Sequence, residues 1–142
     1  MSILLVGLNH KTAPVEVRER LAFTDEACAE SLRVLVDGEV VREGLIVSTC
    51  NRVEVLAETN APVKESFDRI KDFLSQSRRI GHDDFANHLY SHEEERAVRH
   101  VFRVASSLDS MVVGEPQVLG QVRHAYSIAL EAGTAGRILN RL

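Results

Sequence analysis

One stretch of the sequence contains two strand-like patterns in succession: Leu45-Ile46-Val47-Ser48-Thr49-Cys50-Asn51-Arg52-Val53-Glu54-Val55-Leu56-Ala57. Its first five residues are a mostly apolar run, which predicts a buried strand over 45–49. Its last five residues alternate in polarity, which predicts a second strand over 53–57. Between them, Asn51 can take a left-handed turn conformation. The stretch therefore predicts two strands joined by a hairpin-like turn that carries a cysteine.

The residues before this stretch predict one more strand and two helices. Ile3-Leu4-Leu5-Val6 is an apolar run closed by Gly7, which is typical of a buried central strand. Pro14 suits the first turn of a short helix that reaches about Leu21. Thr24 can cap a second helix, whose inner face is a stripe of Cys28, Leu32 and Leu35.

The residues after the stretch complete the fold. Pro62 opens a helix with an apolar stripe at helical spacing, and a weaker strand is expected near Asn87–Ser91. The order is then β-α-β-β-α-β, the ferredoxin-like arrangement, with its first helix split in two. From His92 onward the pattern is helical, over about 93–106, about 116–132 and again from Arg137. We therefore expect an α+β fold with a ferredoxin-like subdomain over 1–91 and a helical subdomain over 92–142.

The composition is that of an ordinary globular domain of 142 residues, with 44% hydrophobic and 27% charged residues. A net charge of −4 argues against non-specific nucleic-acid binding, although it allows a local basic patch. The low aromatic content, 5% with no Trp, weighs against a stacking platform for single strands. No apolar run has membrane-spanning length and no signal peptide is visible, so we expect a cytoplasmic protein with reduced thiols and no membrane partner.

The two cysteines differ in position. Cys28 lies on the apolar stripe of its helix, which predicts a small buried hydrophobe. Cys50 follows a buried strand, where scaffolds often present reactive groups, and the nearby Arg52 guanidinium favours a thiolate. A nucleophile and a partly buried turn cysteine beside a solvated arginine are equally compatible with this pattern.

Two polar side chains interrupt the helical apolar stripes. His100 lies just outside the stripe of its helix, where an imidazole can be a general acid or base, although a plain helix-edge histidine is commoner. Gln121 lies within the next stripe, with Gln117 one turn earlier, so it needs hydrogen-bond partners from the protein or from a ligand. Both glutamines are near a helix N-terminus, which favours anionic ligands.

Several common sites are missing from the sequence. It contains no Gly-x-Gly-x-x-Gly after a strand and no Walker loop, so no dinucleotide site is visible. His88 and His92 are four residues apart, but they span a predicted strand-to-helix junction, and two cysteines make no zinc site alone. We expect no bound metal.

Three blocks together resemble glutamyl-tRNA reductase: Gly7–Pro14, Ser48–Glu54 and Arg103–Val122. The resemblance covers essentially the whole chain and keeps the blocks in order. Members of that family are longer, with a linker helix, an NADPH-binding domain and a dimerisation domain after the catalytic domain. The resemblance therefore implies an N-terminal catalytic domain that stops, at Arg137–Leu142, where the linker helix begins.

The family reduces the activated carboxyl of glutamate on tRNA to glutamate-1-semialdehyde, the first step of tetrapyrrole (porphyrin and heme) synthesis by the C5 pathway. The resemblance implies that Cys50 attacks the aminoacyl ester to form a thioester, and that His100 assists proton transfer. The implied substrate-binding residues, with Arg52 suited to grip the glutamate side-chain carboxylate, are Thr49, Asn51, Arg52, Ser110, Glu115, Pro116, Gln117 and Gln121.

The resemblance also implies partners that this chain does not itself contain. NADPH would be bound by the missing domain, so we expect the fragment to lack reductase activity. Glutamyl-tRNA is the implied substrate, with a homodimer for the full-length enzyme and glutamate-1-semialdehyde aminomutase as a channelling partner. The alternative is a ferredoxin-like ligand-binding or protein-interaction module without chemistry, because a fold does not fix a function.

Overall fold

The computed structural model describes residues 2–106, 117–136 and 138–139. The strands are β1 (Ser2–Asn9), β2 (Val41–Ser48), β3 (Arg52–Thr59) and β4 (Tyr90–Glu93). The helices are α1 (Val15–Leu21), α2 (Asp25–Leu35), α3 (Val63–Arg78), α4 (His82–Phe85), a 3-10 turn η1 (Ala86–His88), α5 (Glu95–Ala105) and α6 (Gln117–Ala132).

The four strands form one antiparallel sheet in the order β2-β3-β1-β4. This order, with α1 and α2 between the first two strands and α3 before the last, confirms the expected α+β ferredoxin-like sheet followed by helices. The β2–β3 hairpin is the stretch from which the fold was predicted. The register sets Gly7 of β1 opposite Glu54 of β3, and Asn9 opposite Arg52.

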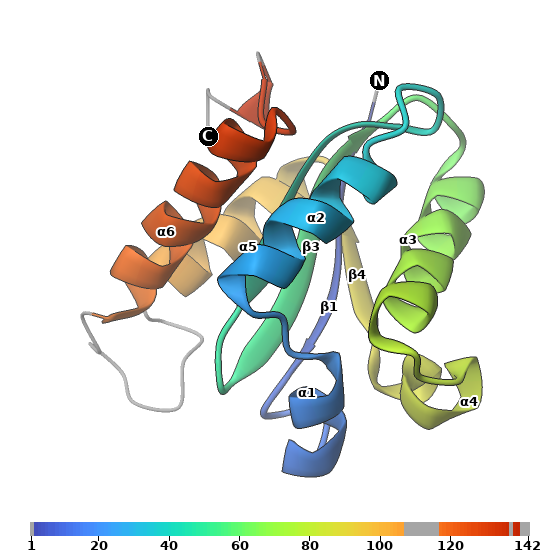
Figure 1. The fold of residues 1–142 in the computed structure, drawn as a ribbon, viewed down its shortest axis with the longest axis vertical. Helices are drawn as coiled ribbons and strands as arrows, with labels where there is room; N and C mark the ends of the chain where they lie inside the picture. Colours follow the sequence, from blue (N-terminus) through green and yellow to red (C-terminus); the bar gives the residue numbers. More distant parts are fainter. Residues whose placement is uncertain (1, 107–116, 137, 140–142) are drawn as a thin grey trace.

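One face of the sheet packs on α2 and α3. Figure 1 shows both helices in front of the sheet, with α5 behind it. Four strand residues on the front face are at most 2% exposed: Leu4, Val6, Ile46 and Val55. They belong to the same core as Phe73 of α3. This face therefore forms the hydrophobic core of the domain together with α2 and α3.

The opposite face is divided along its length. Around its middle it is apolar, where Leu5, Val47 and Leu56 lie with Val101 of α5 and Val122 of α6 around a small cavity. Toward the end where β1 finishes and β3 starts, the same face is polar and carries Arg52, Glu54 and Tyr90.

Local signals explain where several helices begin. The Thr24 hydroxyl accepts a hydrogen bond from the Ala27 amide at 3.2 Å, which confirms it as the cap of α2. Pro62 precedes α3, as its fixed φ angle favours. Arg79 ends α3 in the left-handed conformation with φ 53°.

The last strand departs from its predicted position. We expected it near Asn87–Ser91, but β4 spans Tyr90–Glu93, because α4 and η1 occupy the residues before it. The expected boundary between residues 91 and 92 therefore falls inside β4. The helix that follows begins at Glu95, after Glu94 with φ 50°.

The segment after α6 is fastened along the edge strand β2. The Glu43 carboxylate accepts hydrogen bonds from the backbone amides of Gly136, Ile138 and Leu139 at 2.9–3.2 Å. The Gly44 amide donates to the Thr134 carbonyl at 2.8 Å. The helix expected from Arg137 lies largely outside the described residues. In the part of the chain that the structure describes, no helix has the length and apolar character needed to cross a membrane.

Candidate functional site

Cys50 lies on a turn that a neighbouring side chain holds together. The Thr49 hydroxyl accepts hydrogen bonds from the amides of Asn51 and Arg52 at 3.1 and 3.2 Å, and the Thr49 amide donates to the Arg52 carbonyl at 2.8 Å. Cys50 is exposed on this turn. Thr49, predicted to bind substrate, therefore also has a structural role in presenting the thiol.

Cys28 has the opposite environment. It lies in α2 with 5% of its surface exposed, as its place on the apolar stripe predicted. Burial, followed by the negative charge of Asp25, raises the pKa of the Cys28 thiol to about 11 despite the opposing charge of Arg78. Because the thiolate is the nucleophile, the raised pKa and the burial of Cys28 both disfavour its reaction near neutral pH, and Cys50 is the accessible thiol.

The centre of the polar end is Glu54, a residue that we did not single out from the sequence. Its carboxylate is only 3% exposed and meets three side chains from three segments. It accepts hydrogen bonds from Tyr90 Oη at 2.6 Å and Arg52 Nη1 at 3.2 Å, and it pairs with His100 Nε2. Strands β3 and β4 and helix α5 thus converge on one buried carboxylate.

Glu54 is held in its charged form by these partners. Burial by itself would raise its pKa, but the hydrogen bond and charge of His100, then the charge of Arg52 and the Tyr90 hydroxyl, lower the pKa below its usual value. A charged carboxylate in this position orients the imidazole of His100, as the carboxylate does in a catalytic triad.

Gly7 makes this burial possible. It pairs with Glu54 across the sheet, and a Cβ at position 7 would lie 2.5 Å from the Val53 carbonyl oxygen and 2.7 Å from Glu54 Cγ. Any larger residue would displace the strand or the carboxylate. The glycine that closes the first apolar run therefore has a packing role at the site.

His100 lies at the surface side of the cluster formed by Glu54, Arg52, Tyr90 and His100. Its side chain is 11% exposed and lines a cavity of about 430 Å³ together with Asn9, Tyr90, His92 and three arginines of α5. The rings of His92 and His100 stack with centroids 4.7 Å apart, and the Tyr90 ring lies 5.4 Å from His100. The sequence places His100 just outside an apolar stripe, and in the structure its side chain is largely buried.

Arg52 is buried rather than solvated, which corrects the picture of a turn cysteine beside a solvated arginine. Its side chain is 2% exposed and pairs with Glu54 inside the fold. The sequence pattern alone does not reveal that Glu54, two residues later, pairs with Arg52 inside the fold. Its grip on a substrate carboxylate stays a prediction, and the structure adds a role in fixing Glu54.

Gln121 lies away from the Glu54–His100 cluster. It lines a smaller cavity of about 180 Å³ between α2 and α6, beside Cys28, Ser48 and His124. The Ser48 hydroxyl there accepts a hydrogen bond from the Phe23 amide at 2.9 Å. Gln117 is the first residue of α6. The predicted substrate residues Ser110, Glu115 and Pro116 lie outside the described residues.

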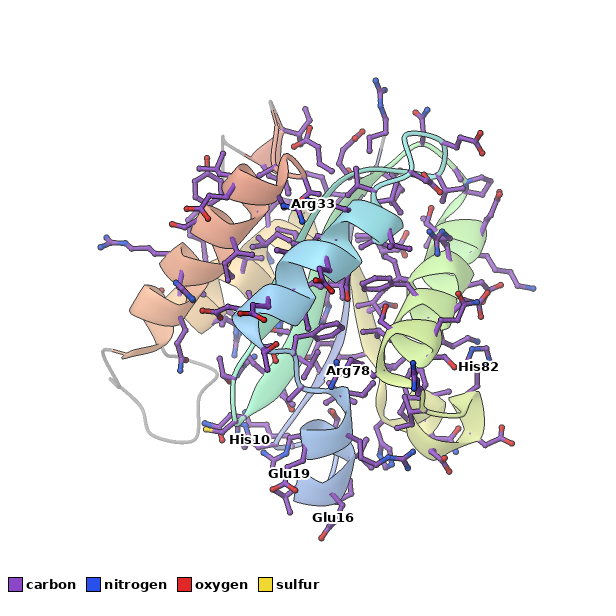
Figure 2. All side chains as sticks on the ribbon, in the orientation of Figure 1. His10, Glu16, Glu19, Arg33, Arg78 and His82 are labelled. Carbon is purple, nitrogen blue, oxygen red and sulfur yellow. The ribbon has the colours of Figure 1, made fainter. Side chains whose placement is uncertain are left out.

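The arrangement places an exposed thiol and a histidine–glutamate pair at one end of the sheet. Four positions separate Cys50 from Glu54, at most roughly 14 Å of extended chain. Figure 2 shows His10, the residue after β1, at this same end. Among residues 2–106, 117–136 and 138–139, no group of His, Cys, Asp and Glu side chains is arranged to hold a metal ion.

Comparison with known proteins identifies the family of this chain. A sequence model of the family described as "Glutamyl-tRNAGlu reductase, N-terminal domain" matches residues 6–142. The chain is 56% identical over 141 residues to a glutamyl-tRNA reductase of Pelobacter propionicus, and 52% identical over 141 residues to one of Geobacter metallireducens. Each alignment covers 99% of this chain and 32% of the relative, so the chain spans about a third of their length.

A solved structure gives the same result. Glutamyl-tRNA reductase from Methanopyrus kandleri superposes with a TM-score of 0.76 at 35% identity, covering 97% of this chain and 30% of that one. The sequence match and the shared fold agree on one assignment. The chain belongs to the glutamyl-tRNA reductase family and corresponds to its N-terminal domain.

Proposed function

We propose that this chain is the acyl-transfer part of a glutamyl-tRNA reductase and acts through Cys50. The observation that supports it most is the exposed thiol on a fixed turn, at the end of the sheet where the buried Glu54–His100 pair opens onto a cavity. Cys28 cannot take this role, because it is buried and its thiol pKa is raised to about 11.

The proposed step is attack of the Cys50 thiolate on the ester carbonyl that joins glutamate to the terminal ribose of tRNA. The new C–S bond replaces the C–O bond to ribose, and the ribose oxygen leaves with a proton from His100. Ionised Glu54 keeps the imidazole oriented for that transfer. The product is a glutamyl thioester on Cys50 and a deacylated tRNA.

The described residues do not fit a dinucleotide cofactor. Their sheet is antiparallel throughout, and they contain no parallel β-α-β unit with a glycine-rich turn at a helix N-terminus. We therefore assign NADPH to the remainder of the longer family members, where it supplies hydride for reduction of the thioester to glutamate-1-semialdehyde in tetrapyrrole synthesis. We also propose a cytoplasmic location, a homodimer for the longer enzyme, and a glutamate-1-semialdehyde aminomutase partner.

The test is mass spectrometry of the chain after incubation with glutamyl-tRNA. We expect a glutamyl adduct on Cys50, which is absent in Cys50→Ser and retained in Cys28→Ser. We also expect slow release of free glutamate, slower in His100→Asn, and no glutamate-1-semialdehyde when NADPH is present. Binding of glutamyl-tRNA without any adduct on Cys50 would instead favour a non-catalytic binding module.

A further inference from the structure

A stripe of arginines runs along α5 beside His100. Arg96, Arg99 and Arg103 follow a spacing of three and four residues, which places them on one side of the helix. All three are exposed and all three line the 430 Å³ cavity that His100 also lines. The stripe spans about 10 Å of helix, which is room for more than one small anionic group.

The positive charge of this stripe is largely uncompensated. Arg99 lies 3.7 Å from Glu95, but the two side chains are 71% and 87% exposed, so the pair is weak. Among the described residues, neither Arg96 nor Arg103 has an acidic partner within ion-pair distance. The whole chain has a net charge of −4, but the three arginines make the charge around this cavity positive.

We propose that this arginine stripe binds the phosphates of the unpaired 3′ end of the aminoacylated RNA. The inference rests on the proposed function, because it requires the aminoacyl ester to enter from the His100 side. The amino acid is attached to the terminal ribose, so the preceding phosphates lie near whatever surface surrounds the reacting carbonyl. The stripe is the charged surface beside the proposed proton donor.

The neighbouring aromatic residue favours RNA over another anion. Phe102 lies in α5 three positions after Arg99, so the two side chains are neighbours on the helix surface. Phe102 is 58% exposed and points away from the core. Unpaired RNA ends are typically held by stacking of bases on aromatic rings and arginine planes, together with phosphate contacts. A free phosphate gains nothing from an exposed ring, whereas an unpaired nucleotide can stack its base on one.

Two RNA hairpins with the same stem test this proposal, one blunt and one with four unpaired 3′ nucleotides. We expect the chain to bind the tailed hairpin at least fivefold more tightly. Arg96→Gln/Arg99→Gln/Arg103→Gln should lose at least tenfold in affinity for the tailed hairpin, and its log–log salt dependence should fall by about 2. Phe102→Ala should lose about fivefold for the tailed hairpin alone.

The matched control is Arg33→Gln, which removes the same charge from an exposed position. Arg33 lies in α2, and Figure 2 shows it far from the end marked by His10. Its affinity for both hairpins should be unchanged. Circular dichroism should show that the triple variant is folded.

Equal binding of both hairpins, or unchanged affinity in the triple variant, would overturn the inference. So would displacement of the tailed hairpin by inorganic phosphate or by an oligoglutamate peptide at equal charge concentration. The adduct assay on Cys50 separates the two proposals. An adduct with no effect of the arginines refutes the stripe alone, whereas arginine-dependent RNA binding without an adduct refutes the acyl-transfer function.

Discussion

The two faces of the sheet are built from the same strands but bury different kinds of side chain. The face toward α2 and α3 is built from residues such as Val6, Ile46 and Val55 and buries almost only hydrocarbon. The face toward α5 buries Arg52 and Glu54 within a few residues of apolar positions. Because strand side chains alternate, a single residue step along β3 moves from one environment to the other.

This difference in buried side chains predicts that the front face contributes most of the stability and that the other face serves the chemistry. Hydrocarbon on the front face contributes free energy in proportion to buried area and tolerates substitutions of similar volume. A buried ion pair on the face toward α5, here called the back face, adds little net stability. Losing one partner of that pair leaves a buried charge without compensation. We therefore expect the two faces to respond differently to mutation.

The largest loss of stability is expected on the front face. Phe73 is 1% exposed and stacks on Phe23 with centroids 6.2 Å apart. Phe73→Ala should lower the free energy of unfolding by about 4 kcal/mol, measured by urea denaturation. Phe102→Ala, at an exposed position, is the stability control. If folded Phe73→Ala also lost the labelling of Cys50 by iodoacetamide, the separation of the two faces would be refuted.

On the back face, Glu54→Gln should cost about 3 kcal/mol at neutral pH because Arg52 stays buried without its counter-charge. The control is Glu95→Gln, which breaks an exposed pair and should leave the denaturation midpoint unchanged. Unlike Phe73→Ala, Glu54→Gln should also slow adduct formation on Cys50.

Acid should reduce this difference between the wild type and Glu54→Gln. Since the folded-state pKa of Glu54 is lowered, its ionised form stabilises the fold above the ordinary glutamate pKa of about 4.3. That contribution is lost as the pH falls through the lower folded-state pKa. A difference in stability that stayed constant from neutral pH into the acid range would contradict an ionised Glu54.

A smaller effect is expected at the contact between β1 and β3. Gly7→Ala should cost about 2 kcal/mol, because the new methyl group meets backbone and the Glu54 side chain. Gly120→Ala introduces the same group into α6 where nothing lies within 4 Å, and should be neutral or slightly stabilising. Equal thermal midpoints for the two variants would show that the backbone yields at Gly7.

The fold was largely predictable because its signals are local. Apolar runs located β1 and β2, and Thr24 and Pro62 marked the starts of α2 and α3. The start of β4 was misplaced, because α4 has four residues and η1 three, too few to show a helical period.

The site was less predictable because its contacts are distant in sequence. Cys50 and His100 could be named from position and from the family resemblance. Glu54 could not be recognised from its surroundings, since an alternating strand normally places such a residue on a solvated face. Only the packing of α5, some 46 positions later, turns that face into an interior.

The fastening of the chain along β2 has a consequence for solubility. An edge strand with free amides and carbonyls is a template on which another molecule can add a strand. Here Gly44 donates to Thr134, and the Glu43 carboxylate holds the amides of Gly136 and Leu139 beside the same edge. The other edge strand, β4, has only four residues. The contacts of Glu43 thus hold a cover over one border of the sheet, and the shortness of β4 limits pairing at the other, so we expect little intermolecular β-pairing.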